Sequence, residues 1–389
     1  MLLSTAALGL GSALLPLSPT AARAYTLAAI PGAPVRSYGP NGTHWPAHTP
    51  RTGHAVTLRV ACNWAAIRSA IASVTAAQAA RGVIILVGAG TLPADAARDM
   101  LSNVGSATWS RNVLITPEPG YGTVTMTGTV RMRRVEGVTF ARFIAHNIRM
   151  VDCTRTTWAH CKLNYGMRIY SSSGVVSGCD GYELVMPNSR VNPEDAFSYS
   201  AGPGSTLTDC VWEGCYSAPI FRPNGSSAHL DTFQMFGGGF YRGLTIRDSV
   251  FFGSNNCALQ IGGSFPSDPR RGTNFLTLDH SIVMSQSMAM QTRFPMLAGG
   301  SGNGGQAING GGEDGQLSAI NGSYVLGSMH VTRWNRVQDS YTSHARAVTG
   351  NPARTGQWIY RSDLVNMTAA QLTNLAPVPS DAYLRRIWT

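Results

Sequence analysis

An apolar residue followed three positions later by Phe, Cys or Ser recurs along this chain in the stretches VTFARF, TTWAHC, VVSGC, TLTDC, LTIRDS and LTLDHS. The gaps between successive apolar residues are 18, 18, 31, 39 and 32 residues. Each stretch alternates apolar and polar positions, which predicts a strand rather than a helix. Because the strands persist while the gaps vary, we predict an all-β fold, a single-stranded right-handed parallel β-helix whose loops differ from coil to coil. The apolar residues are Phe140, Trp158, Val176, Leu207, Ile246 and Leu278.

The same pattern predicts what fills the interior. The residues three positions on are expected to stack in register inside the coils, about 4.8 Å apart. Most of them are small, namely Cys161, Cys179, Cys210, Ser249 and Ser281. Ile85 in VIILV and Ile115 in NVLIT extend the series towards the N-terminus, giving about eight coils.

The start of the solenoid has its own signal. Residues 63–80 place Trp64, Ile67, Ile71 and Val74 on one face of a helix, ahead of the strand VIILV. The first coil of a solenoid otherwise exposes unpaired strand edges and an open apolar interior. We therefore predict that this amphipathic helix is an N-terminal cap.

These segments together resemble a known superfamily. The run from Trp64 to Thr91, the NVLITPEPG that follows, the stacked VTF and LTI strands, and residues 229–253 resemble secreted bacterial right-handed parallel β-helix proteins of the pectate-lyase-like superfamily. The resemblance covers roughly residues 60–340. It implies the fold and leaves the chemistry open, because that superfamily includes lyases, hydrolases, epimerases and proteins with no known activity.

We expect one main domain. Residues 63–340 are predicted to form the β-helix with its cap, residues 25–62 an N-terminal extension, and residues 341–389 a C-terminal cover with a short helix from Ala369 to Leu375. Glycines crowd residues 299–315, which predicts a loop.

The first 24 residues predict export. An apolar run precedes Ala22-Arg23-Ala24, so we expect a signal peptide cleaved after Ala24 and a secreted or periplasmic product, although a positively charged start is missing. No later stretch reaches the ~18 apolar residues that span a bilayer, which argues against membrane insertion. The chain has 7 cysteines, and in an exported protein Cys210 and Cys215 are the first pair to test for a disulfide.

A polar ladder is predicted on one outer face. If Phe197, Phe233 and their equivalents point inward, the residue after each points outward on the same face. Those outward residues are Ser198, Gln234, Gln260 and Gln291, with Arg168, Tyr170 and Arg149 towards the N-terminus and Arg293 towards the C-terminus.

Such a face suits an acidic polysaccharide. Amides bind hydroxyls, guanidinium groups grip carboxylates, and aromatic rings stack on sugars. Cleavage of a uronate polymer by β-elimination needs a group that neutralises the carboxylate and a base that removes the neighbouring proton. The predicted catalytic set is His229, Asp231, Arg222 and Tyr170, with His229 or Tyr170 as base. The predicted substrate-binding residues are Gln234, Gln260, Gln291, Arg293, Arg168 and Ser198.

Other functions stay open. Asp195 and Asp231 occupy equivalent positions and could be the paired carboxyl groups of a glycoside hydrolase, and a non-catalytic glycan-binding or cell-surface role is a further alternative. No resident cofactor is expected. If a metal such as calcium is used, Glu194, Asp195 and Asp231 are the plausible group. Net charge is +10, but the arginines are dispersed, so nucleic acid is not expected as a partner. The sequence does not indicate an oligomeric state.

Overall fold

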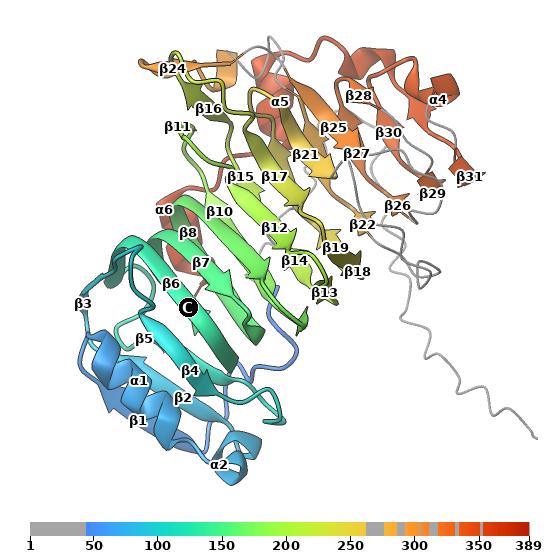
Figure 1. Cartoon of the computed structure of the whole chain (residues 1–389). Helices are drawn as coiled ribbons and strands as arrows, with labels where there is room; N and C mark the ends of the chain where they lie inside the picture. The colour runs from blue at the N-terminus through green and yellow to red at the C-terminus, as the bar shows by residue number, and fades with distance from the viewer. Residues whose placement is uncertain are drawn as a thin grey trace, which may run out of the picture.

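The chain winds into a parallel β-helix, as predicted. The computed structural model describes residues 44–261, 276–285, 292–302, 305–310, 318–330, 334–350 and 353–388. Strands on successive coils pair in parallel, for example Leu58 beside Ile85 and Ile85 beside Ile115. Figure 1 shows the strands side by side along the solenoid. The coils run from Val56 to Tyr360, past residue 340, because the last strands also pair in parallel with the coil before them.

Each coil contributes to three walls. The first wall holds β1 (Val56–Val60), β2 (Val83–Val87), β5 (Val113–Pro117), parts of β6 (Val124–Ala141), β8 (Thr154–Ser171) and β10 (Asp180–Met186), β14 (Val211–Glu213), β19 (Leu244–Arg247), β22 (Leu276–Asp279), β26 (Ser318–Asn321), β29 (Trp334–Gln338) and β31 (Ala353–Gly356). Its interior row contains Ile85, Ile115, Phe140, Trp158, Trp212, Ile246 and Leu278. The sequence predicted six of these seven side chains; Gly181 and Trp212 take the positions given to Val176 and Leu207.

The second and third walls complete the coil. The second wall holds β3 (Gly90–Pro93), parts of β6, β7 (Ile144–Val151), β8 and β10, β15 (Tyr216–Ser217), β20 (Val250–Phe252), β23 (Ile282–Met284), β27 (Tyr324–Leu326), β30 (Tyr341–Thr342) and β32 (Ile359–Tyr360). The third wall holds β4 (Leu101–Gly105), parts of β6, β7 and β8, β12 (Phe197–Ala201), β17 (Asp231–Phe236), β21 (Cys257–Ile261), β25 (Gln306–Gly310) and β28 (Met329–His330).

Two small sheets explain the misplaced repeats. Val176 and Leu207 pair with each other and with Tyr241 in a separate sheet of β9 (Val175–Ser177), β13 (Thr206–Thr208) and β18 (Phe240–Arg242). These two stretches have the same motif as the others, with an apolar residue three positions before a Cys. In the longer coils, however, the motif lies in this extra sheet, which precedes the first wall. A second small sheet joins β11 (Arg190–Val191), β16 (Ile220–Pro223) and β24 (Gly300–Ser301). With β24 and β25, part of the loop predicted at residues 299–315 is strand, so that prediction was wrong there.

A row of left-handed residues turns the first wall into the second. One residue of each coil has φ between 46° and 70° at this corner: Arg142, His160, Glu183, Gly214, Asp248 and His280. The next residue points inward, and there Cys161 and the serines form one stack. The amide of Ser249 donates to Ser281 Oγ (3.1 Å), and the amide of Ser281 donates to Ser323 Oγ (3.0 Å). Cys179 and Cys210 are not at this corner, because they come shortly after β9 and β13 of the small sheet.

The N-terminal end is covered by two helices. Helix α1 (Trp64–Ser73) begins at Asn63, whose side chain accepts from the amide of Ala66, and it buries Ile67 and Ile71 completely. Helix α2 (Ala76–Ala80) follows as a separate helix where one continuous helix was predicted. Thr75 explains the break, because it forms a capping box with Gln78 and starts the second helix.

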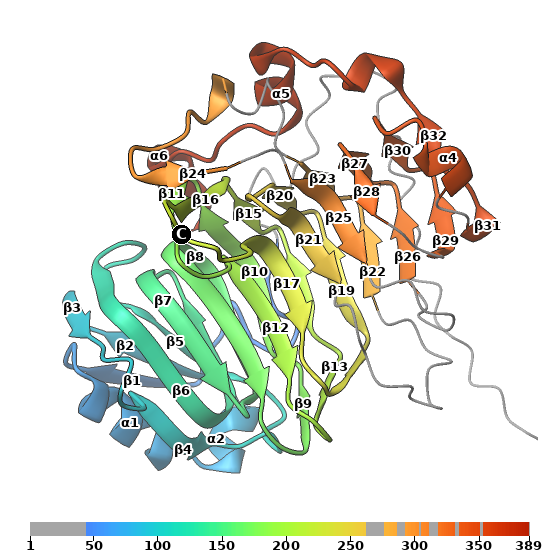
Figure 2. The same ribbon diagram turned by 45° about the horizontal axis from the view of Figure 1, so that its top comes forward.

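Both ends of the chain return along the solenoid. Helices α5 (Ala369–Leu375) and α6 (Asp381–Ile387) lay an apolar cluster, including Leu372 and Leu384, over the outside of the second wall. Helix α5 has the bounds that the sequence predicted. Figure 2 shows these helices beside the wall, while α4 (Ala347–Gly350) lies near the last coils. A 3-10 turn covers Ser362–Leu364. The N-terminal segment, residues 44–50, packs Trp45 on the outside of the first wall.

All seven cysteines carry free thiols, so the Cys210–Cys215 disulfide is not formed. The two residues belong to different interior rows, and burial raises the pKa of the Cys210 thiol to about 12. The predicted signal peptide lies outside the described residues. None of the helices in the described ranges has the length and apolar character that a membrane span requires.

Candidate functional site

One continuous polar row runs along the outside of the third wall. Its register places Arg131 beside Arg149, Arg149 beside Arg168, and Arg168 beside Ser198. The row continues through Gln234, Gln260, Asn309 and His330. We call these eight residues the arginine–glutamine row. The register therefore places Arg168, Ser198, Gln234 and Gln260 in one row, as predicted, but Ser198 is buried and is not available to a ligand.

The C-terminal part of the ladder differs from the prediction. Asn309 of β25 follows Gln260, in the place that the sequence analysis gave to Gln291. Gln291 itself lies outside the described residues. Arg293 is not on the row, because its guanidinium lies over the ring of Phe294, which packs into the cluster on the second wall. β25 lies in a glycine-rich stretch, for which the sequence predicted a loop.

A pocket lies at the arginine end of the row. A parallel row two residues further along each strand contains Arg133, Val151, Tyr170, Ser200 and Phe236. The two rows enclose a pocket of about 420 Å³. Its lining comprises Arg131, Arg133, Arg149, Met150, Val151, Arg168, Tyr170, Ser172, Ser200 and Phe236. The predicted residues Arg168 and Tyr170 therefore share one concave surface.

The arginines of this pocket differ in their partners. Arg131 and Arg133 share the carboxylate of Asp99, with Nε to oxygen distances of 2.9 Å and 3.1 Å. Arg149 donates to both oxygens of Glu194 at 2.9 Å. Among the described residues Arg168 has no ion pair or hydrogen bond, and its guanidinium lies 5.7 Å from the centre of the Phe236 ring. The pocket thus presents a cation without a carboxylate partner.

Two acids lie at the start of the neighbouring third-wall strands. Asp195 Oδ1 accepts the amide of Asp231 at 3.0 Å, which links two successive coils. Burial raises the pKa of Asp195 to about 7, the nearby Asp231 adds to this, and Arg168 opposes it. Asp195 can therefore hold or release a proton near neutral pH beside the free guanidinium.

Asp231 has no exposed surface. Its carboxylate accepts from Asn256 Nδ2 (2.8 Å), Gln234 Nε2 (3.1 Å) and the Cys257 thiol (2.8 Å). Burial raises its pKa. In this structure Asp231 holds the corner of a coil and does not face the outer surface, where a hydrolase would need it.

The remaining members of the predicted catalytic set are dispersed. His229 is exposed in the loop between β16 and β17. Arg222 of β16 donates from Nε to Ser301 Oγ at 3.1 Å, so it is tied to β24. Of the suggested calcium ligands, Glu194 is engaged by Arg149. Tyr170 alone of the predicted catalytic residues lines the pocket.

Sequence reasoning missed Arg131, Arg133 and Phe236. A signal for the arginines was present, because an Arg between two apolar residues recurs at 131, 149 and 168, with gaps of 18 and 19 residues. That period is one short coil. Phe236 had no such signal, because only the register of β17 against β12 places it beside Ser200.

Comparison with known proteins gave structural likenesses only. No family model and no curated protein matched the chain. An alginate lyase from a Paenibacillus strain is similar over 79% of this chain and 98% of its own, with 15% identity and a TM-score of 0.36. The catalytic domain of a GH87 alpha-1,3-glucanase is similar over 86% of this chain and 69% of its own, with 11% identity and a TM-score of 0.31. A PL6 family polysaccharide lyase from Pseudopedobacter saltans is similar over 85% of this chain and 99% of its own, with 11% identity and a TM-score of 0.24. The activities named there belong to those proteins.

Proposed function

We propose that this protein binds an acidic polysaccharide along the outside of the third wall and cleaves it by β-elimination in the arginine pocket. We also propose that the chain is exported through the leader ending at Ala24, which would bring it to such a polymer. N-terminal sequencing of the secreted product would test that cleavage.

The observation that carries the proposal is the guanidinium of Arg168, which has no hydrogen bond or ion pair among the described residues and lies in a pocket with three further arginines. A planar guanidinium binds a carboxylate through two parallel hydrogen bonds, which gives geometric specificity as well as attraction. Beyond the pocket the same row changes to Gln234 and Gln260, whose amide groups suit neutral sugar hydroxyls, while the intervening Ser198 is buried. The row therefore matches a chain of sugars that carries carboxylates over the arginine end.

The reaction requires three contributions from these residues. Arg168, with Arg149, would neutralise the uronate carboxylate, which lowers the cost of removing the adjacent carbon-bound proton. Tyr170 lines the same pocket, and its hydroxyl would transfer that proton. As the carbon–carbon double bond forms, the bond to the bridging oxygen breaks, and that oxygen takes up a proton. His229 does not line the pocket, so we favour Tyr170 over it as the proton-transfer group.

One observation favours non-catalytic binding as the second candidate. The residues predicted for catalysis do not converge, because Asp231 is fully buried and Arg222 is held by Ser301. A row of arginines and amides without a converging acid–base pair is sufficient for glycan recognition. The two candidates share the binding face and differ only in whether bonds break there.

The deciding experiment offers purified full-length protein alginate, pectate, glucuronan and hyaluronan in turn. β-Elimination creates an unsaturated uronate that absorbs in the ultraviolet, and titration calorimetry reports binding separately. Growth of that absorbance supports cleavage, whereas binding without absorbance assigns the second candidate. The absence of both signals with all four polymers would contradict the proposed function.

Variants locate the chemistry. Arg168→Ala should weaken binding about 10- to 100-fold, the usual worth of a hydrogen-bonded charge pair. Arg59→Ala is the matched control, because it also removes an arginine, but one whose partner is Glu118 at 2.6 Å and which is absent from the pocket. Tyr170→Phe should keep binding and lower the turnover rate by about 10² to 10⁴. Unchanged turnover in Tyr170→Phe would remove Tyr170 from the mechanism, and His229→Ala would then be the next variant.

A further inference from the structure

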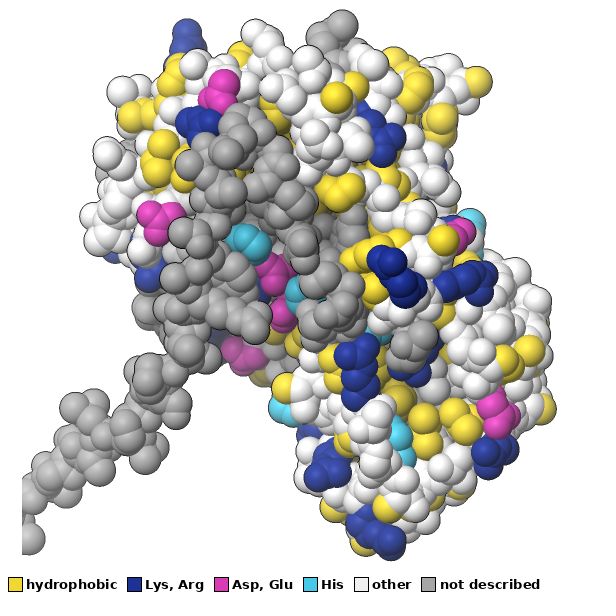
Figure 3. Space-filling view, turned by 180° about the vertical axis from the view of Figure 1, so that it is seen from behind, with side chains coloured by type: hydrophobic (Ala, Val, Ile, Leu, Met, Phe, Trp, Pro, Cys, Tyr) yellow, Lys and Arg dark blue, Asp and Glu magenta, His cyan; other side chains and the backbone are white. Residues whose placement is uncertain are grey.

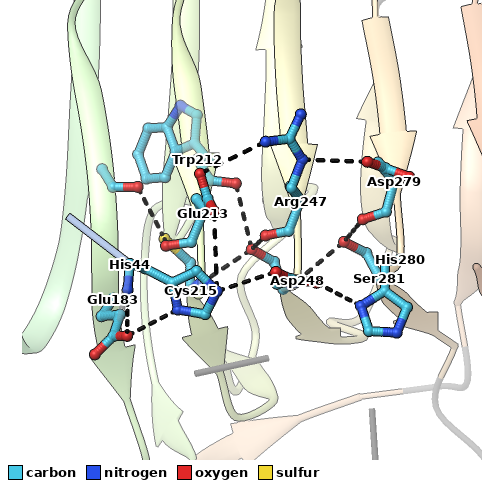
Figure 4. A network of polar contacts seen from close by, with 12 residues as sticks. His44, Glu183, Trp212, Glu213, Cys215, Arg247, Asp248, Asp279, His280 and Ser281 are labelled. Carbon is cyan, nitrogen blue, oxygen red and sulfur yellow. Dashed lines mark hydrogen bonds and ion pairs between the residues drawn. The ribbon is translucent and has the colours of Figure 1, made fainter. Parts of the chain in front are cut away.

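Three side chains from distant parts of the chain meet at the corner between the first and second walls. His44 comes from the N-terminal segment, Glu213 ends β14, and Asp248 is the left-handed corner residue after β19. His44 Nε2 lies 3.0 Å from Asp248 Oδ2 and 3.9 Å from Glu213 Oε1. One ligand atom from each residue lies within 4.8 Å of the others, and within the described ranges no other such group of three occurs. Figure 4 shows the three side chains pointing toward one another.

These separations suit a small divalent ion. Zinc binds imidazole nitrogen and carboxylate oxygen at about 2.0 to 2.2 Å, so the ligand atoms of a tetrahedral site lie about 3.3 to 3.6 Å apart. The two separations from His44 Nε2, 3.0 Å and 3.9 Å, lie on either side of that value. The Glu213 side chain is 21% exposed, so it has room to move toward an ion.

The groups around this set orient it as they do in known metal sites. His44 Nδ1 lies 2.8 Å from Glu183 Oε1, so an Nδ1 proton donated to that carboxylate leaves Nε2 to bind a metal. A carboxylate behind a ligating histidine is the usual second layer of zinc sites. His280 Nδ1 hydrogen bonds the other oxygen of Asp248, which leaves Oδ2 directed at His44.

The local charge balance also favours a cation. Three carboxylates gather here, those of Glu183, Glu213 and Asp248. They face His44, His160 and His280, and Arg247 lies 3.9 Å from Glu213 but also pairs with Asp279 at 3.1 Å. With the imidazoles neutral, as metal binding requires of His44, the three carboxylates are only partly compensated. Seen from behind, histidine and acidic side chains gather near the middle of the molecule (Figure 3). Uncompensated charge in a partly buried site is costly, and a bound cation removes that cost.

We propose that His44, Glu213 and Asp248 bind one Zn²⁺ ion, which fastens the N-terminal segment to the corner of the solenoid. The ion would take the place of the proton that His44 Nε2 otherwise shares with Asp248. An imidazole ligand favours zinc over calcium or magnesium, which prefer all-oxygen sites. The strands that carry Glu213 and Asp248 belong to the first wall, whereas the arginine pocket is built on the third. The role is therefore structural and independent of glycan cleavage.

The test uses the untagged full-length chain, stripped with EDTA and dialysed, and titrated with zinc chloride in a calorimeter. We expect one Zn²⁺ per chain, a higher unfolding temperature with zinc, and much weaker binding of calcium. Glu213→Gln and Asp248→Asn each remove one ligand and should weaken zinc binding at least about 100-fold, since even outer-layer substitutions cost 10- to 100-fold.

Asp279→Asn is the matched control. Asp279 contacts the same Arg247 at 3.1 Å but is not in the ligand group, so its substitution should change zinc affinity by less than about fivefold. Circular dichroism confirms that each variant is folded; if Asp248→Asn is not, the partly exposed Glu213 decides the question. The proposal is overturned if wild-type protein binds no zinc, or if Glu213→Gln binds it as tightly as wild type.

Discussion

Two polar rows run along this solenoid, and they differ in what covers them. The arginine–glutamine row lies on a strand face of the third wall, where Arg131, Arg149 and their neighbours border an open pocket. The corner row, which contains His160, Glu183, Asp248 and His280, extends from left-handed turns and lies beneath the two ends of the chain. Glu183 is the clearest example of a covered residue, because its carboxylate hydrogen bonds His44 of the N-terminal segment and Trp388 at the end of helix α6.

The difference shows how one repeated scaffold separates recognition from stability. Charges that remain partly exposed cost little to maintain and stay available to a ligand, whereas charges buried at the corner must be matched inside the protein. Burial alone would lower the pKa of His44, yet its hydrogen bonds to Asp248 and Glu183 raise that pKa to about 10. The corner therefore works as an internal polar network that fastens the segment beginning at His44 and the end of the C-terminal helix.

The largest expected effect comes from breaking that network. Glu183→Gln keeps the shape of a side chain with 0% exposure but leaves His44 and Trp388 facing a neutral amide. Removing one partner of a buried ion pair costs about 3 to 5 kcal/mol. Urea unfolding in the presence of EDTA should show that loss, while glycan binding by the folded protein should be unchanged.

Glu118→Gln is the control for that variant. Glu118 also pairs with a cation, Arg59, but both side chains are exposed, at 41% and 65%. We expect a change of at most about 1 kcal/mol there. Equal losses in the two variants would contradict the distinction between the covered corner and the open surface.

One buried aspartate near each row has a raised pKa, and these two aspartates provide a further test of the comparison. Burial raises the pKa of Asp180, the first residue of β10 in the first wall, and of Asp195, near the pocket, to about 7 in each case. The folded protein keeps those protons up to about pH 7, whereas the unfolded chain releases them near pH 4. The contribution of these two acids to stability should therefore fall as pH rises from about 4 to 7 and level off above that.

Substitution by asparagine separates the two acids. Asp180→Asn keeps an acceptor for the Val211 amide and should flatten the stability profile, making the variant more stable than wild type at pH 8 by up to about 4 kcal/mol. Asp195→Asn should act in the same sense and also affect binding, because ionised Asp195 competes with a ligand carboxylate for Arg168. Wild-type affinity for a uronate polymer should weaken above pH 7, and Asp195→Asn should abolish that trend. A stability profile that rises between pH 4 and 7 in wild type, with no difference in Asp180→Asn, would contradict the raised pKa.

The features that depend on strand alternation could be predicted from the sequence. The parallel coils, the interior stack through Phe140, Trp158 and Ile246, and the outward Ser198, Gln234 and Gln260 all follow from a period of two residues. Helix α5 followed equally from local signals. These features require only neighbours in the chain and the rule that equivalent residues stack on successive coils.

What the sequence could not predict depends on loops and on the chain ends. Val176 and Leu207 carry the repeat motif yet belong to an extra sheet, because motif spacing does not reveal where a coil widens. His44 and Glu183 are 139 residues apart, and only the return of the N-terminal segment along the corner joins them. The same limit applied to His229 and Asp231, whose closeness in sequence suggested a common site although one is exposed and the other buried.

The smallest expected effect tests the neutral row just inside the corner. Ser281 Oγ donates to the carbonyl of Asp279 at 2.9 Å and accepts the amide of Ser249 at 3.1 Å, which links two coils beside the charged network. Ser281→Ala leaves that amide without its acceptor and should lower stability by about 1 to 2 kcal/mol. Ser73→Ala, an exposed helical position, should stay within about 0.5 kcal/mol in the same unfolding assay. A loss in Ser281→Ala as large as that in Glu183→Gln would show that coil-to-coil hydrogen bonds, and not the buried charges, dominate the stability of this corner.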